Sequence, residues 1–278
     1  MKRDTFIFKY LSGIIGIIVT AAIFIVPFVF IFFTAVKDRG QAALREFTLP
    51  ESFLFFENLI AVIEARDYML ITAFVNSTVL TVASVGGMVI FGAMVAFVLQ
   101  RRVTRFTGLI NALILAGLII PPAVVPTIWV LQGLNLFKTL HGLIFIEVAF
   151  GLAFTILLFR AFISSIPREL DEAAIIDGAG PIKLFFRVIF PLLRSVIATV
   201  IILQSITVFN DFQNPLYFLP GDENATVQLT LYNFQSQFNT SFNLLYMNIL
   251  IITIPMLILF LLFNRRIVSG MTAGAVKG

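Results

Sequence analysis

The chain has 278 residues, of which 59% are hydrophobic and only 12% are charged, and its mean hydropathy is +1.02. These values exclude a soluble globular protein, in which about a quarter of the residues are charged. The formal net charge of +4 would suggest a nucleic-acid partner in a soluble chain, but here membrane topology explains the basic residues better. Because the chain has no cysteine and a single histidine, His141, it offers neither disulfides nor a cluster of thiolate or histidine metal ligands.

Six apolar runs are long enough to cross a membrane, which takes about 20 residues for roughly 30 Å of hydrocarbon. They lie at about residues 10–36, 69–99, 109–134, 143–163, 188–210 and 244–264. Their length and their content of Leu, Ile and Phe favour helices over a β-barrel. We therefore predict an all-α membrane protein with six transmembrane helices, built as one domain over residues 1–278.

The first run follows Lys2 and Arg3, as the apolar part of a signal peptide would. It is much longer than the roughly 7–15 apolar residues of a signal peptide, and Thr34-Ala35-Val36 is not a typical cleavage site. We therefore expect a permanent first span. The polar stretch after it, residues 37–68, is expected outside the membrane, with a short interfacial helix at Phe53–Ile63.

Prolines are expected to interrupt the third and the last of the predicted spans. Pro121, Pro122 and Pro126 lie inside the third, and proline removes a helical hydrogen bond and clashes with the preceding turn. This helix should therefore kink or unwind, either as tolerated irregularity or as a bent helix that lines a cavity. Pro255 predicts a smaller break in the last span.

The distribution of basic residues predicts the orientation. If the N-terminus lies in the cytoplasm, 14 of the 19 Lys and Arg residues fall in inner segments. Only Lys37, Arg39, Arg45, Arg66 and Lys138 fall in outer segments. Both termini and the segment 166–191 are therefore predicted to be cytoplasmic.

This segment, which we call the coupling loop, is the most polar stretch between two apolar runs. Pro167 followed by acidic residues is typical of a helix start, and Asp177-Gly178 is typical of a helix end. We predict a short helix closed by a glycine turn, exposed for docking of a soluble partner. The alternative is a solvated loop in which Arg168 and Lys183 satisfy Glu172.

The coupling loop also carries a recognisable spacing. It has Glu172-Ala173-Ala174, then after three residues Gly178, then after nine residues Val188-x-Phe190-Pro191. This spacing resembles the EAA loop of the permease subunits of ATP-binding-cassette (ABC) importers, which usually ends in I-x-L-P. Similarity to the carbohydrate-uptake, maltose-type branch extends to four segments, namely Pro167–Gly178, Asn76-Ser77, Phe209–Phe212 and the tail Ile267–Gly278.

The resemblance implies a permease fold whose cytoplasmic coupling helix docks a separate ATPase. The residues it assigns to this docking are Glu172, Ala173, Ala174, Asp177, Gly178 and Pro191. It also implies that a C-terminal tail with Gly270, Gly274 and Lys277 reaches the ATPase interface, although such a tail could equally be a frayed terminus.

The chain has no Gly-x-x-x-x-Gly-Lys-Ser/Thr loop, so ATP and Mg²⁺ are expected on the ATPase and no cofactor, metal or catalytic residue is expected here. It is thus predicted not to be an enzyme. The partners implied are a second permease subunit, which we expect to be a different chain, two copies of a cytoplasmic ATPase and an extracytoplasmic sugar-binding protein. The location implied is the plasma membrane of a prokaryote.

Polar residues within the spans are candidates for a substrate path, because polar groups are costly in lipid. A sugar needs hydrogen-bond partners for its hydroxyls and an aromatic face for its ring, which Asn210 and Phe209 could supply; the family usually has Trp where this chain has Phe209. The other candidates are Asn76, Gln204 and Glu147. The alternative roles are hydrogen bonding between helices and, for Glu147, pairing with Lys138.

We therefore predict a subunit that moves a carbohydrate, specifically an oligosaccharide, into the cell by alternating access. Importers of an amino acid, phosphate or a polyol are the alternatives within the class. An ion-coupled secondary transporter would need a coupling-ion site, and the shortage of buried carboxylates argues against it. An intramembrane enzyme should have a cluster of His or carboxylate groups, which the sequence lacks.

Overall fold

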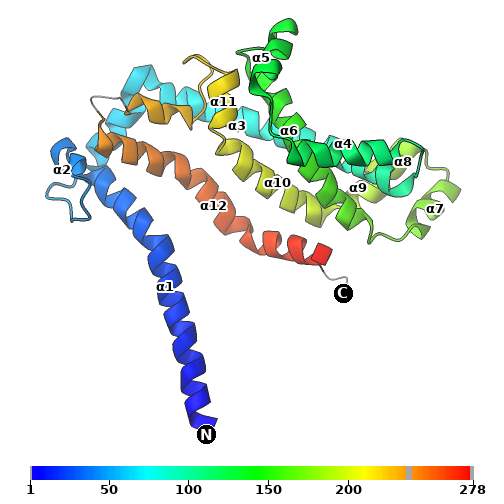
Figure 1. Cartoon of the computed structure of the whole chain (residues 1–278), viewed down its shortest axis with the longest axis horizontal. Coiled ribbons are helices and arrows are strands. Elements are labelled where there is room, and N and C mark those ends of the chain that lie inside the picture. The colour runs from blue at the N-terminus through cyan, green and yellow to red at the C-terminus, as the bar shows by residue number, and fades with distance from the viewer. Residues whose placement is uncertain (1, 236–239, 276–278) are drawn as a thin grey trace. The chain divides into compact units, whose positions relative to one another are not determined.

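The computed structural model describes residues 2–235 and 240–275, which form helices and no strand (Figure 1). The long helices are α1 (Lys2–Val36), α3 (Phe55–Arg101), α4 (Thr107–Ile119), α5 (Val124–Gly133), α6 (Leu140–Ile163), α10 (Arg194–Phe209) and α12 (Phe242–Ala275). The short ones are α2 (Arg39–Ala43), α7 (Glu169–Ile176), α8 (Pro181–Leu184), the π-helical turn η1 (Phe185–Ile189), α9 (Phe190–Leu192), α11 (Gln213–Phe218) and the 3₁₀ turn η2 (Leu229–Asn233).

Four of the described helices are each long and apolar enough to cross a membrane, namely α1, α3, α6 and α12. Two bent pairs, α4 with α5 and α8–α9 with α10, bring the number to six when each pair counts as one span. The predicted all-α membrane class is confirmed. Charged residues are rare in these segments because lipid offers no hydrogen-bond partners or counter-charges.

The third predicted span is broken at its prolines. Helix α4 ends at Ile119, α5 begins at Val124, and the two helices are bent by 114°. Pro121 and Pro122 lie in the gap, where they contribute no backbone N–H, whereas Pro126 lies in the first turn of α5, where an N–H would have no helical partner. The predicted kink is therefore a full break.

The fifth predicted span begins later than expected. Its predicted start, Val188, lies in η1, and the straight helix α10 starts only at Arg194, after a bend of 77°. In the wide turn of η1 the Phe190 N–H donates to the Phe185 carbonyl, and Pro191 then supplies no N–H. The helical ladder is interrupted at this point, so the chain changes direction before α10.

Residues Ala65–Tyr68 have non-helical backbone angles and divide α3 into a short helix from Phe55 and a long one. A short helix therefore lies where one was predicted at Phe53–Ile63, and its place at the membrane interface stays a prediction. The chain packs as two compact units that part near this point. One holds the residues up to Leu70 and Thr230–Ile254, and the other holds Ile71–Leu229 and the residues from Pro255 onward.

In the first unit, a buried asparagine fastens the end of α1. The Asn58 side chain donates from Nδ2 to the carbonyls of Ala35, at 2.8 Å, and Lys37, at 2.9 Å. Its Oδ1 accepts from Asn243 Nδ2 of α12 at 2.9 Å. One amide therefore satisfies carbonyls at the end of α1 and joins α1, α3 and α12 of this unit.

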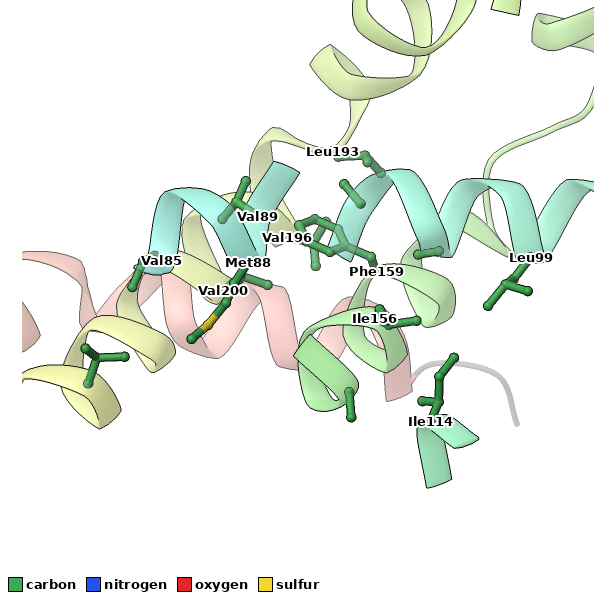
Figure 2. Close-up of a cluster of buried hydrophobic side chains, with 14 of the residues drawn as sticks. Val85, Met88, Val89, Leu99, Ile114, Ile156, Phe159, Leu193, Val196 and Val200 are labelled. Atoms are coloured by element: carbon green, nitrogen blue, oxygen red, sulfur yellow. The ribbon is translucent and has the colours of Figure 1, made fainter. Parts of the chain in front are cut away.

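In the second unit, α3, α4, α6 and the chain from Leu193 through α10 surround a mainly aliphatic core, part of which is shown in Figure 2 and which also contains Phe159, Phe185 and Phe218. Small residues let α3 and α6 approach closely. A Cβ added at Gly92 would lie 2.6 Å from Thr155 Cγ2, and one at Gly151 would lie 2.5 Å from the Met88 methyl group. Since lipid is as apolar as these side chains, close packing rather than hydrophobic transfer holds such helices together.

Candidate functional site

The coupling loop contains the predicted helix, α7. Its first turn carries Glu169, Asp171 and Glu172, whose negative charges are favourable at a helix N-terminus. The helix ends at Ile176 and is closed by a turn at Gly178, whose φ of +78° is the left-handed conformation that glycine adopts without strain. Gly178 N–H donates to the Ile175 carbonyl at 3.0 Å and Ala179 N–H to the Ala174 carbonyl at 2.9 Å, which is the Schellman pattern. The predicted helix and its glycine turn are confirmed.

One face of α7 is exposed although part of it is apolar. Glu172 and Ala173 are exposed, Ala174 is half-buried, and Ile176 is 85% exposed. Figure 1 shows this helix carried on two loops beside α8. A helix of eight residues is too short to be stable alone, and an exposed apolar face beside a charged rim is typical of a docking surface.

The opposite face of α7 is held against the end of α3 by a buried ion pair. Asp171 Oδ2 lies 2.6 Å from Arg101 Nε, and the two side chains are 12% and 11% exposed. Sequence reasoning missed this pair, because 70 positions separate the two residues. Helical spacing could have predicted that Asp171 faces inward, since it lies three positions before Ala174 and therefore on the same face of the helix.

A cavity of about 660 Å³ lies between α7, α8, η1 and the end of α3. Phe97, Val98 and Phe185 form apolar parts of its wall, and Arg102 and Glu172 lie at the wall as well. The coupling loop is therefore arranged around a concave apolar surface with charged groups at its edge.

The remaining residues assigned to ATPase docking lie apart from α7. Pro191 is half-buried in α9, where it interrupts the helical ladder before α10. In the predicted tail, the helical backbone of α12 continues through Gly270 and Gly274 to Ala275, well past the predicted end of the last span near residue 264. Lys277 lies outside the described residues.

Gln204, a predicted path residue, is 4% exposed and faces α6. Its Nε2 donates to Thr155 Oγ1 at 2.9 Å and to the Gly151 carbonyl at 3.2 Å. These are the same two residues of α6 against which α3 packs closely. Gln204 thus lies at a junction of three helices.

Three other predicted path residues gather near the end of α10. Asn210 is exposed and its Oδ1 accepts from Gln228 Nε2 at 3.2 Å. The Asn76 Nδ2 donates to the Ala225 carbonyl at 3.1 Å, and the buried Phe209 ring lies 6.4 Å from the ring of Phe74. The structure therefore brings Asn76, Phe209 and Asn210 to one end of the second unit, close to the segment 225–228.

Glu147 is buried in α6 and accepts a hydrogen bond at Oε1 from Asn214 Nδ2 of α11 at 3.1 Å. Asn214 itself is positioned by Asp211, whose Oδ1 accepts from the backbone N–H groups of Gln213 and Asn214. The alternative partner, Lys138, instead has its ammonium 5.9 Å from the centre of the Phe137 ring. In the described part of the chain, no three His, Asp or Glu side chains are grouped so as to hold a metal ion.

Comparison with known proteins identifies this arrangement. Residues 88–272 match the family described as binding-protein-dependent transport system inner membrane component. The chain belongs to this family, and it is a multi-pass transport permease.

Among curated proteins, the melibiose/raffinose/stachyose import permease MelC of Bacillus subtilis is 32% identical over 95% of each chain. The probable starch degradation products permease AmyC of Thermoanaerobacterium thermosulfurigenes is 29% identical over 99% of each. The diacetylchitobiose uptake permease NgcG of Streptomyces coelicolor is 30% identical over 94% of this chain and 87% of its own length.

A solved structure has the same fold. A chain of a bacterial ABC transporter involved in the import of the acidic polysaccharide alginate matches with a TM-score of 0.80. The match covers 95% of this chain and 98% of the other at 21% identity, a level at which it shows the fold alone. The predicted permease fold is confirmed.

Proposed function

We propose that this chain is a membrane subunit of an ATP-driven importer that carries an oligosaccharide into the cell by alternating access. The observation that carries the proposal is the similarity, over 95% of both chains, to a permease named for melibiose, raffinose and stachyose import. The relatives named for starch degradation products and diacetylchitobiose point to the same class of substrate.

The end of α10 is the proposed sugar-contacting region. Asn210 presents an exposed side-chain amide there, and the side chain of Tyr217 on α11 is also exposed. An amide can both donate to and accept from sugar hydroxyls, and aromatic rings can stack on a sugar ring. The buried Phe209 supports this region through its contact with Phe74 rather than by exposing its own face.

Helix α7 is the proposed docking element for a cytoplasmic ATPase. Its exposed face carries Glu172, which would pair with a cation of the ATPase, beside exposed apolar side chains that could fill a groove. ATP and Mg²⁺ would then be held by two ATPase copies, and the chain would assemble with a second permease subunit and receive sugar from an external binding protein. Both termini and α7 would lie in the cytoplasm, as the distribution of basic residues favours.

Transport by the purified complex tests the substrate class. The complex would be isolated through a tag on this chain, reconstituted in vesicles with its binding protein, and supplied with ATP at the ATPase side. Uptake of labelled raffinose, maltotriose and diacetylchitobiose would be compared with uptake of phosphate, an amino acid and a polyol. We expect uptake of at least one oligosaccharide; uptake confined to one of the other solutes would contradict the proposal.

A further inference from the structure

Helix α7 is connected to the end of α3 by side chains as well as by the peptide chain. Arg101, the last residue of α3, forms the ion pair with Asp171 and also donates from Nη2 to the Ile166 carbonyl at 3.1 Å. One guanidinium thus holds both α7 and the middle of the loop that precedes it. Arginine suits this position because its planar group can donate in several fixed directions.

A second hydrogen bond joins the same two elements, with its donor beside α7 and its acceptor on α3. Arg168, at the start of α7, donates from Nη2 to the Gln100 carbonyl of α3 at 3.4 Å. This carbonyl belongs to the last turn of α3, where carbonyls have no partner within the helix, and a cation there is also favoured by the helix dipole. The bond is long and Arg168 is exposed, so we treat it as an aid to the Arg101–Asp171 pair.

Burial makes the pair a stiff connection. Both side chains are nearly nine-tenths buried, so solvent screens their attraction little, and separating them would leave a charge without its counter-charge. The peptide connections of α7 are less direct, because the segments 164–168 and 177–180 separate it from α6 and α8. With these two loops alone, α7 could pivot without moving the membrane helices.

We propose that the Arg101–Asp171 pair is a latch that transmits displacement of α7 to α3. The proposal rests on the proposed docking of α7 to an ATPase, and it makes Asp171 and Arg101 positioning residues for energy coupling. From Arg101 the helix α3 leads to Gly92 and Met88, which contact Thr155 and Gly151 of α6. Displacement of α3 would therefore reach the junction at which Gln204 of α10 is bonded.

Continuity of contacts does not establish coupling, so the test measures coupling itself. Asp171→Asn would be purified in the full transporter and compared with wild type for the amount of ATPase that co-purifies, for ATP hydrolysis and for sugar transported per ATP hydrolysed. We expect the ATPase to stay bound and active while transport per ATP falls about 5-fold or more, the lower end of typical coupling between sites. Arg105→Gln, which removes an exposed cation from the loop after α3 and lies outside the cavity wall, should leave that ratio unchanged.

A covalent replacement separates a latch from a merely structural contact. Because the chain has no cysteine, Arg101→Cys with Asp171→Cys gives two unique thiols that a short bis-maleimide can join. The double variant should be uncoupled before cross-linking and recover transport per ATP after it. The double variant also decides the case in which the Asp171→Asn permease is not recovered from the membrane, since a cross-linked complex that stays uncoupled overturns the latch.

The latch and the docking of α7 fail in different ways. An unchanged transport ratio in Asp171→Asn overturns the latch and leaves docking intact. Loss of the ATPase from Asp171→Asn complexes also overturns it, because Asp171 would then act in docking. If Glu172→Lys on the exposed face leaves both ATPase binding and coupling at wild-type levels, the docking proposal itself is wrong.

Discussion

Two polar side chains of α10 lie in different surroundings and should serve different purposes. Gln204 is buried and bonded to two residues of α6, whereas Asn210 ends the helix and is exposed. A polar group inside a membrane helix must find a partner within the protein, and Gln204 finds its partners on α6. Only Asn210 presents its amide where a solute could meet it without breaking a contact between helices.

Asn210→Ala is expected to weaken sugar uptake. Losing one hydrogen bond to a bound hydroxyl costs about 1 kcal/mol, or roughly 5-fold in affinity. The concentration dependence of uptake by reconstituted vesicles measures this, with Asn224→Ala, in a nearby loop, as the control.

Gln204→Ala should instead lower the melting temperature of the purified complex, because an interhelical hydrogen bond contributes roughly 0.5–2 kcal/mol to stability. If Gln204→Ala changes only uptake affinity, Gln204 faces the substrate path.

The charge of Glu172 is expected to matter for ATPase binding because it lies on the exposed face of α7. Glu172→Lys would replace the proposed attraction to a cation of the ATPase by a repulsion, so the ATPase should be lost from the purified complex while the permease remains in the membrane. Glu169→Lys makes the same charge change in the first turn of the same helix. Equal loss of ATPase in both variants would mean that the charge of the helix as a whole, and not Glu172, is recognised.

Elements of this molecule begin and end where backbone chemistry requires. Gly178 closes α7 through its positive φ, and the space around it is open, since an added Cβ would meet no atom within 4 Å. Its role is therefore conformational rather than steric. Pro121, Pro122 and Pro191 likewise mark the two places where a predicted span is interrupted. The smaller break predicted at Pro255 is absent, because α12 continues as one helix through that residue.

Gly178→Val is expected to disturb the end of α7, because a β-branched residue is strained at a φ of +78° by about 1–2 kcal/mol. ATPase co-purification should fall as the glycine turn is lost. Gly178→Asn should be milder, since asparagine tolerates the left-handed conformation. Gly180→Val is the matched control, because Gly180 lies two residues away with an ordinary φ of −69°. A Gly178→Val complex with full ATPase content would show that the turn is dispensable.

At the scale of the whole molecule, the distribution of basic residues predicts the orientation in the membrane. With both termini inside, Arg102 at the end of α3 should be cytoplasmic and Glu223, in the exposed loop after α11, should be outside. Arg102→Cys and Glu223→Cys each introduce a single thiol, because the native chain has none. An impermeant maleimide applied to intact cells should label only the Glu223 position. Labelling of the Arg102 position from outside would reverse the orientation.

The features that the sequence alone determined are those that depend on neighbouring residues. Apolar runs, rare charges and the breaks at Pro121 and Pro122 follow from the chemistry of the bilayer and the backbone. The helix of the coupling loop and its end at Gly178 could be predicted because acidic residues and glycine act within one or two turns. The spacing from Glu172 to Pro191 likewise predicted the permease family, and the match over residues 88–272 confirms it.

Only the tertiary structure decided which distant residues meet. The pairing of Arg101 with Asp171 and of Gln204 with Thr155 joins positions separated by 70 and 49 residues. Such pairs depend on how helices cross, and in lipid that depends on close packing at positions such as Gly92 and Gly151. Packing also explains part of the late start of α10. Val188 is apolar enough for a membrane span, but it belongs to the turn η1, which contacts α7 and α9. The apolar character of a residue predicts that it is buried in lipid or in protein, whereas packing determines which helix it belongs to.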